Sequence, residues 1–294
     1  MKTNRHDFLA LTLGLLAAGC TRMSDAKEVK PHFKISLAQW TLQKELFSGK
    51  IDNLDFAKVA SDHQIFGLEY VNQFFMNKTN DSKYLGEMKT RAEDLGVESI
   101  LIMVDREGDL GDPDEKKRMQ AVDNHRKWID TAKFLGCHSI RVNARSRGAY
   151  GEQVSLAVDG LSKLTEVGAG QGINVIVENH GGLSSNADWL SEVMEKVNHP
   201  MCGTLPDTGN FKIKKGVSYD SYRGMKKLMK WAKGVSIKQK VYDDHGNSSP
   251  MDFVKMLQIV ADAGWRGYCG IEFGGYAGLN QSRTLLEEAR AKLT

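Results

Sequence analysis

Three acidic residues each end a short apolar run bounded by glycine or proline: Glu178 in INVIVENHGG, Asp207 in MCGTLPDTGNF and Glu272 in YCGIEFGG. Each run is typical of a buried strand. Parallel strands bring their carboxyl ends to the same side of a sheet, so the three carboxylates are predicted to converge. Converging carboxylates repel one another unless a cation or protons intervene, and hard divalent ions prefer oxygen ligands. We therefore predict a site for one divalent metal ion (Mn, Mg, Co or Zn). The alternative is that each residue is a solvated acid at a strand end.

Eight apolar runs alternate with eight helical patterns along the chain. The predicted strands cover residues 33–40, 65–71, 97–104, 139–143, 173–178, 202–206, 234–238 and 268–273. The predicted helices cover residues 54–63, 83–95, 114–135, 152–169, 186–197, 219–230, 249–264 and 279–291, the seventh of them beginning at Ser249-Pro250, a helix-start signal. This alternation predicts a parallel, eight-stranded (β/α)8 TIM barrel as a single domain over residues 33–294, a length close to the typical size of about 250 residues. A doubly wound open sheet is the alternative, but no Gly-x-Gly-x-x-Gly follows the first strand.

The first 20 residues have the pattern of a signal peptide. Lys2 and Arg5 precede an apolar run over residues 8–18, which is too short to span a bilayer. The run ends in Leu-Ala-Ala-Gly-Cys, which is similar to a bacterial lipobox and would make Cys20 the lipidated N-terminus of the mature protein. Residues 21–32 would form a polar tether. We expect an exported protein, periplasmic or tethered to the outer membrane only through Cys20, with an ordinary cleaved signal as the alternative.

Charge and cysteine content exclude other classes. Lys and Arg total 40 against 37 Asp and Glu, a net charge of +3, so no nucleic-acid partner is expected. Besides Cys20 the chain has Cys137, Cys202 and Cys269, an odd number whose spacing fits no zinc pattern. We interpret them as small core residues.

Four segments in this order, VIVENHGG, TLPDTGNF, GVSIKQKVYDD and GYCGIEFGG, resemble the xylose isomerase-like barrel superfamily, often labelled sugar phosphate isomerase/epimerase. The resemblance extends over residues 33–294. In its epimerase branch a Glu, an Asp, a His and a Glu, one after each of strands five to eight, hold one divalent metal. Glu178, Asp207 and Glu272 match three of these positions, and Ser236 stands where the histidine is usual. Relatives are often homo-oligomers.

The resemblance implies a metal-dependent sugar isomerase or epimerase that removes a proton next to a carbonyl and forms an enediolate. Glu178 and Glu272 would then be base and acid, and Asp207 a pure ligand. A 3-keto-glycoside lyase or hydratase on the same site is one alternative, and a non-catalytic sugar-binding lipoprotein is another. An endonuclease IV-like nuclease is disfavoured because too few histidines are placed for its three metals. For an exported protein, a neutral sugar or glycoside is a better substrate than a phosphorylated sugar.

Other polar and aromatic residues follow the predicted strands on the same face. Lys238 alternates with Ser236 and points inward, either as a catalytic proton donor or enolate-stabilising cation, or as an ion-pair partner of the carboxylates. Trp40 either stacks on a sugar or packs under a loop. The candidate substrate-binding residues are His180, Asn143, Trp40, Glu69, Asn210 and His245. His180 and His245 are also candidates for the missing metal ligand, or are loop histidines with structural hydrogen bonds.

Overall fold

The structure, a computed structural model, describes residues 32–294 of the chain. The predicted signal, Cys20 and the predicted tether as far as residue 31 lie outside the described residues.

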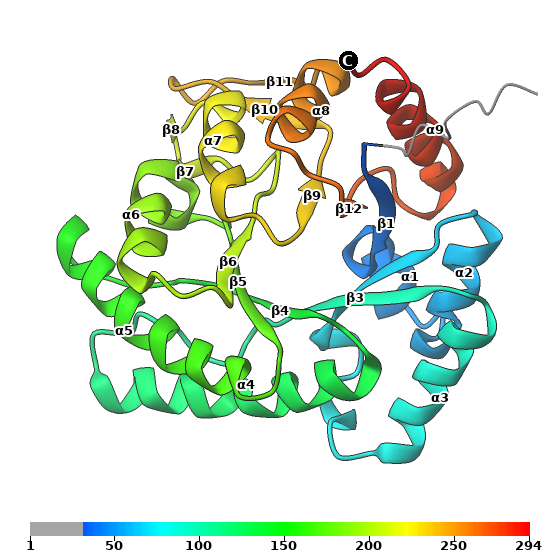
Figure 1. Cartoon of the computed structure of the whole chain (residues 1–294), viewed down its shortest axis with the longest axis horizontal. Coiled ribbons are helices and arrows are strands. Elements are labelled where there is room, and N and C mark those ends of the chain that lie inside the picture. Colours follow the sequence, from blue (N-terminus) through cyan, green and yellow to red (C-terminus); the bar gives the residue numbers. More distant parts are fainter. Residues whose placement is uncertain (1–31) are drawn as a thin grey trace, which may run out of the picture. The chain divides into compact units, whose positions relative to one another are not determined.

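Eight parallel strands form a nearly closed barrel with helices around its periphery (Figure 1), which confirms the predicted TIM barrel. In barrel order the strands are β1 (Lys34–Ala38), β2 (Gly67–Val71), β3 (Glu98–Met103), β4 (Ser139–Val142), β5 (Asn174–Glu178), β6 (Cys202–Leu205), β9 (Val235–Ile237) and β12 (Tyr268–Ile271), and β12 pairs with β1.

One junction of the barrel is weaker than the others. Between β6 and β9 there is no continuous ladder, only isolated bridges that pair Thr204 with Ala232 and Asp207 with Ser236. The amide of Ser236 donates to the carbonyl of Pro206 at 2.9 Å, and the amide of Thr208 donates to the carbonyl of Ser236 at 3.0 Å. We call this junction the seam.

The strand residues divide into two apolar layers because side chains alternate along a strand. Val175 and Val177 of β5 join the large cluster that packs against the helices, whereas Ile176 joins a smaller cluster of buried side chains from β1, β2, β3 and the end of β6. Glu178 follows Ile176 by two residues and therefore shares its inward face. This alternation directs the carboxylate to the mouth of the barrel.

The helices of the described part are α1 (Gln43–Phe47), α2 (Phe56–Asp62), α3 (Ser82–Asp94), α4 (Glu115–Leu135), α5 (Tyr150–Ala169), α6 (Ala187–Val197), α7 (Ser221–Leu228), α8 (Phe253–Asp262) and α9 (Leu279–Arg290). Side-chain caps fix several starts, as where Asp114 accepts the amides of Lys116 and Lys117 before α4. None of these helices has the length and apolar content needed to cross a membrane. Cys137, Cys202 and Cys269 are buried free thiols, as predicted.

The prediction of a helix start at Ser249-Pro250 is wrong. Residues Ser248–Pro250 form strand β11, which pairs with β10 (Lys240–Tyr242) in an antiparallel hairpin. The helix α8 begins instead after Asp252, whose carboxylate accepts the amide of Lys255 at 3.0 Å. A second short hairpin, β7 (Lys212–Lys214) with β8 (Val217–Ser218), also lies in a segment without a predicted strand. Both hairpins follow strands of the seam.

Candidate active site

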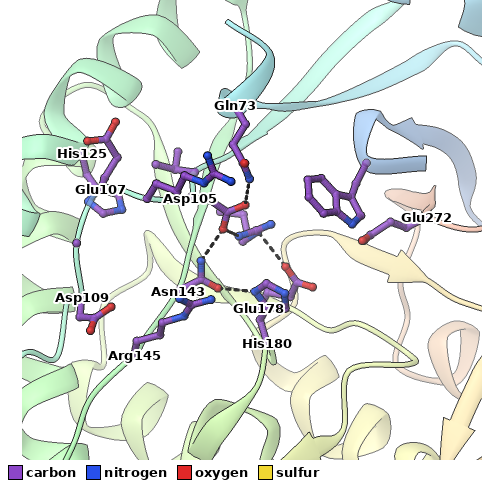
Figure 2. Close-up of a pocket in the computed structure, with 15 residues that line it drawn as sticks. Gln73, Asp105, Glu107, Asp109, His125, Asn143, Arg145, Glu178, His180 and Glu272 are labelled. Carbon is purple, nitrogen blue, oxygen red and sulfur yellow. Dashed lines mark hydrogen bonds and ion pairs between the residues drawn. The ribbon is translucent and has the colours of Figure 1, made fainter. Parts of the chain in front are cut away.

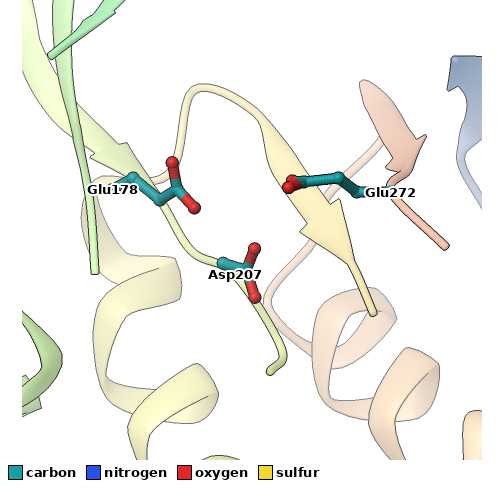
Figure 3. Close-up of side chains that lie close together, drawn as sticks. All are labelled: Glu178, Asp207 and Glu272. Atoms are coloured by element: carbon teal, nitrogen blue, oxygen red, sulfur yellow. The ribbon is translucent and has the colours of Figure 1, made fainter. Parts of the chain in front are cut away.

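Three carboxylates meet at the carboxyl ends of the barrel strands and point toward one another (Figure 3). Glu178 is the last residue of β5, Asp207 lies two residues beyond β6, and Glu272 directly follows β12. One oxygen of each lies within 4.8 Å of the others. Asp207 is fully buried and Glu178 is 2% exposed. The structure therefore confirms the predicted convergence of the three acids, which we call the carboxylate triad.

Lys238, the residue directly after β9, joins the triad. Its ammonium nitrogen lies 2.9 Å from Asp207 Oδ2 and forms a second, shorter ion pair with Glu272. Ser236, at the position where the resemblance led us to expect a histidine, donates its hydroxyl to Glu272 Oε2 at 2.7 Å. Burial alone would lower the pKa of Lys238, but the attraction of Asp207 and Glu272 raises it above its ordinary value, so this amine stays protonated.

Arg141 neutralises the other side of the triad. It is buried on β4. Its Nε lies 2.9 Å from Glu178 Oε2, and its Nη1 lies 2.9 Å from Asp105 Oδ1. Nε and Oε2 do not align for a hydrogen bond, so this contact is an ion pair without one. Burial opposes ionisation of Asp105, yet Arg141 lowers the pKa of that carboxyl to about 2. Asp105 is therefore an anion that fixes the arginine.

Two asparagines hold the acidic residues in place, Asn210 through their side chains and Asn179 through the backbone of Asp207. Asn210 donates to Glu178 Oε1 at 2.7 Å and to Asp207 Oδ2 at 3.2 Å. Asn179 accepts the amide of Asp207 at 2.7 Å and donates to its carbonyl at 2.9 Å. Gly209 donates its amide to Asp207 Oδ1, and a Cβ at this position would lie 2.8 Å from that of Lys238. The Asp-Thr-Gly-Asn sequence thus orients the central carboxylate.

The three acids differ in their protonation behaviour. Burial raises the pKa of Asp207 to about 7 although Lys238 opposes the shift, and burial also raises the pKa of Glu178 against the attraction of Arg141. Burial acts in the same direction on Glu272, but Lys238 and the hydroxyl of Ser236 outweigh it and lower that pKa. Two basic side chains against three acids leave the triad with excess negative charge when all three acids are ionised.

Glu69 lies beneath the triad, 1% exposed, with its Oε1 accepting the hydroxyl of Ser36 at 2.6 Å. Gly270 faces it so closely that a Cβ there would lie 2.4 Å from Oε1. Its Oε2 is buried without a partner among residues 32–294. Burial raises the pKa of Glu69 to about 8, only partly offset by Ser36. Glu69, predicted to bind substrate, lies among the buried groups that support the site.

Glu69→Gln is expected to make stability less sensitive to pH in the metal-free protein. The native state holds this proton up to about pH 8, whereas the unfolded chain releases it near 4.5, so the wild type loses stability as pH rises between these values. The neutral amide avoids this loss. Relative to its value below pH 4.5, the difference in free energy of unfolding between the variant and the wild type should therefore shift by about 3 kcal/mol in favour of the variant at pH 7. Urea unfolding at pH 5, 6.5 and 8 measures the difference. A difference that stays constant with pH would show that Glu69 is ionised in the native state.

A pocket of about 280 Å³ opens beside the triad (Figure 2). Glu178, Glu272 and Trp40 line one part of it, whereas Asp207 does not reach its wall. His180 also lines the pocket, with its Nδ1 2.8 Å from Asn143 Oδ1. Two further hollows adjoin the pocket; one shares Asp109, Arg145 and His180 with it, and the other shares Trp40 and Glu272.

Most of the residues singled out in the sequence are brought together here. Glu178, Glu272, Trp40, Asn143 and His180 line the pocket, and Asp207, Lys238 and Asn210 contact the triad. His245 does not join them, because it lies exposed in the turn between β10 and β11, where its amide binds Asp243.

Sequence reasoning missed Arg141, Asp105 and His125, which also line the pocket. Arg141 precedes Asn143 by two residues on the same strand face, and an arginine inside an apolar strand was a signal for it. Asp105 follows an apolar run as Glu178 does, so the rule about strand ends applied to it too. His125 lies within α4 and had no comparable signal.

The triad suits a divalent metal chemically. All three donors are carboxylate oxygens, and Glu178 Oε2 is buried without a hydrogen bond from residues 32–294. Hard cations take such oxygens as ligands. Glu178, Asp207 and Glu272 would therefore hold the ion, and no histidine belongs to this cluster in the described part of the chain.

Residues 59–293 match the family described as the xylose isomerase-like TIM barrel. No curated protein matches the chain. A xylose isomerase domain protein from Planctomyces limnophilus superposes with a TM-score of 0.72 and 17% identity, covering 90% of this chain and 99% of its own. The 3-keto-D-glucoside 4-epimerase of E. coli gives a TM-score of 0.68 and 15% identity, covering 87% of this chain and 99% of its own. An IOLI protein with a bound zinc atom gives a TM-score of 0.70 and 13% identity, covering 89% of this chain and 99% of its own. At these identities the likeness establishes the fold.

Proposed function

Because the chain belongs to the xylose isomerase-like TIM barrel family, we propose that it is a sugar isomerase or epimerase that uses one divalent metal ion. The observation that carries the proposal is the triad itself, with two glutamates in the wall of a pocket and an aspartate buried behind them. Similar solved structures include a sugar epimerase and a zinc-bound protein, in keeping with this choice.

The two glutamates would move the proton. Removing a proton from the carbon next to a carbonyl needs a base within hydrogen-bond reach, and returning a proton to carbon needs an acid. Glu178 and Glu272 come from β5 and β12 and both reach the pocket, so one can take the proton and the other can return it. Asp207 cannot share this task, because it is fully buried and does not line the pocket.

A metal held by the triad would polarise the carbonyl and lower the cost of the developing negative charge. Lys238 adds a fixed positive charge next to Glu272, and Arg141 adds one next to Glu178. His180 is oriented by Asn143, which leaves its second ring nitrogen to bind a substrate hydroxyl. Trp40 supplies an apolar surface for the C–H groups of a sugar.

Elimination of an aglycone from a 3-keto-glycoside is the second candidate reaction. It begins with the same proton removal and therefore needs the same glutamates. The observation that favours it is the extent of the pocket, which continues from Glu272 and Glu178 to His125 and leaves space beside the reacting sugar. Release of an aglycone, as opposed to a stereoisomer of the substrate, identifies the lyase.

Metal content tests the proposal. Elemental analysis of purified protein is expected to find about one divalent ion per wild-type chain after reconstitution with Mn²⁺, Co²⁺, Mg²⁺ or Zn²⁺, and little in Asp207→Asn. Asp123→Asn, at an exposed position of α4 paired with Arg126, is the matched control and should bind metal normally. A wild type that stays metal-free under all four conditions would leave a non-catalytic sugar-binding protein as the better account.

We also propose export, with Cys20 as a lipid anchor. The support is the basic start, the short apolar run and the lipobox-like ending of the first 20 residues. Export would place the barrel among extracellular sugars and glycosides. Metabolic labelling with a fatty acid, compared between the wild type and Cys20→Ala, tests the anchor directly.

A further inference from the structure

The pocket has a second half, remote from the triad. Figure 2 shows Asp109, His125 and Arg145 on the opposite side of Asp105 and Asn143 from Glu272. We call Asp109, His125 and Arg145 the distal half. None of the proton-transfer steps described above uses these residues.

His125 is built into this half with one defined hydrogen-bonding role. The residue is 3% exposed, and its Nδ1 lies 2.7 Å from the carbonyl oxygen of Ala121, one turn earlier in α4. A carbonyl only accepts, so Nδ1 carries the proton and Nε2 keeps its lone pair. Among residues 32–294 no group hydrogen-bonds to Nε2. An acceptor of a residue that lines the pocket is thus left for a ligand.

The neighbours of His125 preserve this state. Burial lowers the pKa of His125, so the imidazole is neutral near pH 7. Glu107 Oε1 accepts Trp128 Nε1 at 2.6 Å and lies 2.8 Å from Lys127 Nζ, and a carboxylate in such an ion pair is itself only an acceptor. Glu107 therefore does not take up the free face of the imidazole.

The other two members of the distal half complete a polar lining. Asp109 is half-buried, and its carboxylate has no hydrogen bond or ion pair within the described part of the chain. Arg145 is exposed, and its guanidinium likewise has no ion-pair partner in residues 32–294. The three side chains of the distal half thus present acceptors at His125 and Asp109 and a donor at Arg145. Hydroxyl groups satisfy both kinds, whereas a phosphate would meet the lone pairs of His125 and the negative charge of Asp109.

We propose that the distal half is a subsite for the second ring of a glycoside, in which His125 Nε2 and Asp109 accept hydrogen bonds from ring hydroxyls. This inference rests on the proposed function, since it places the reacting sugar ring at the triad. It makes the substrate a disaccharide or another glycoside with a hydroxylated aglycone.

Calorimetric titration of the metal-loaded protein tests the subsite. The probes are D-glucose, phenyl β-D-glucoside, D-glucose 6-phosphate and the disaccharides cellobiose, maltose and lactose. At least one disaccharide is expected to bind about tenfold more tightly than D-glucose and phenyl glucoside, because only it offers hydroxyls to the distal half. His125→Phe should lose this gain and keep the affinity for D-glucose.

Two further variants distinguish the loss of a sugar contact from misfolding of His125→Phe. Asp109→Asn changes a side chain without an intramolecular partner, so it should fold normally and lose part of the disaccharide gain. His63→Phe, at a histidine paired with Asn280 away from the pocket, should retain the whole gain.

Several outcomes would overturn the subsite. They are disaccharides that bind no better than glucose, a gain that survives both His125→Phe and Asp109→Asn, or tightest binding by glucose 6-phosphate. In each of these cases glucose still binds and the proposed function stands. Failure of every sugar to bind metal-loaded protein would count against the proposed function and the subsite together.

Discussion

Replacing Glu178 with glutamine is expected to lower turnover by about 10²–10⁴-fold, the usual contribution of a positioned acid or base. The amide keeps the shape of the side chain and can still accept the hydrogen bond from Asn210. It cannot take up a proton from carbon, and it removes the charge facing Arg141. Sugar binding should largely persist because the remaining lining is unchanged. Deuterium incorporation from D₂O next to the carbonyl of keto sugars and 3-keto-glycosides measures the proton transfer directly.

Glu93→Gln is the control for this experiment, since Glu93 lies exposed on α3 and, within residues 32–294, pairs with Lys89 alone. Metal content must be measured in parallel, because Glu178 also belongs to the triad. A Glu178→Gln protein that exchanges deuterium within tenfold of the wild-type rate would remove Glu178 from the proton-transfer step. Loss of sugar binding along with exchange would instead indicate a binding role.

Lys238→Met is expected to destabilise the metal-free protein by about 3–5 kcal/mol at pH 8, the range measured when one partner of a buried ion pair is removed. Without the ammonium, Arg141 is the one basic side chain within residues 32–294 that still contacts the triad. Asp207 and Glu272 must then either remain as unpaired buried anions or take up protons, and both cost stability at pH 8. A divalent cation supplies the missing charge. Added Mn²⁺ should therefore stabilise the variant more than it stabilises the wild type, which urea unfolding with EDTA or with Mn²⁺ can measure.

Lys240→Met provides the comparison, because Lys240 lies two residues later on β10 and is exposed. It should unfold like the wild type under both conditions. If metal-free Lys238→Met were as stable as the wild type, the ion pairs of Lys238 would make no net contribution to the free energy of unfolding. If Mn²⁺ stabilised the two proteins equally, the cation site would lie outside the triad.

The positions of the triad were predictable because one rule of the fold governs them. Each acid ends an apolar run, and parallel strands of a barrel gather such ends at one mouth. The rule needs only strand identity and direction, and small errors in strand boundaries do not affect it. The predicted barrel and the meeting of Glu178, Asp207 and Glu272 were therefore confirmed together.

Features that depend on competition between local signals were harder to predict. Ser249-Pro250 is typical of a helix start, yet the two residues pair with Lys240 and Val241 as a strand. The helix begins after Asp252 instead, because the side chain of Asp252 caps it. The alternation along β9 placed Lys238 inward but left two roles open, and the structure shows it paired with Asp207 and Glu272.

The residues that were missed depend on contacts across the fold. Arg141 was read as part of a strand, although its charge requires buried partners that come from β5 and from the end of β3. His125 belongs to the pocket only because α4 packs where it does, and no spacing in the sequence encodes that contact. Such groups become visible only when side chains are placed together.

The seam between β6 and β9 lies next to two members of the proposed metal site, Asp207 and Glu272, and to Lys238. The sheet is held there by isolated bridges, one of which joins Asp207 to Ser236, and the ion pair of Lys238 with Asp207 spans the same gap. A cation held by Asp207 and Glu272 together would connect the two sides of this weakly paired junction. Binding of a cation there is therefore expected to stabilise the closed barrel, because a ligand stabilises the state that holds its binding residues together.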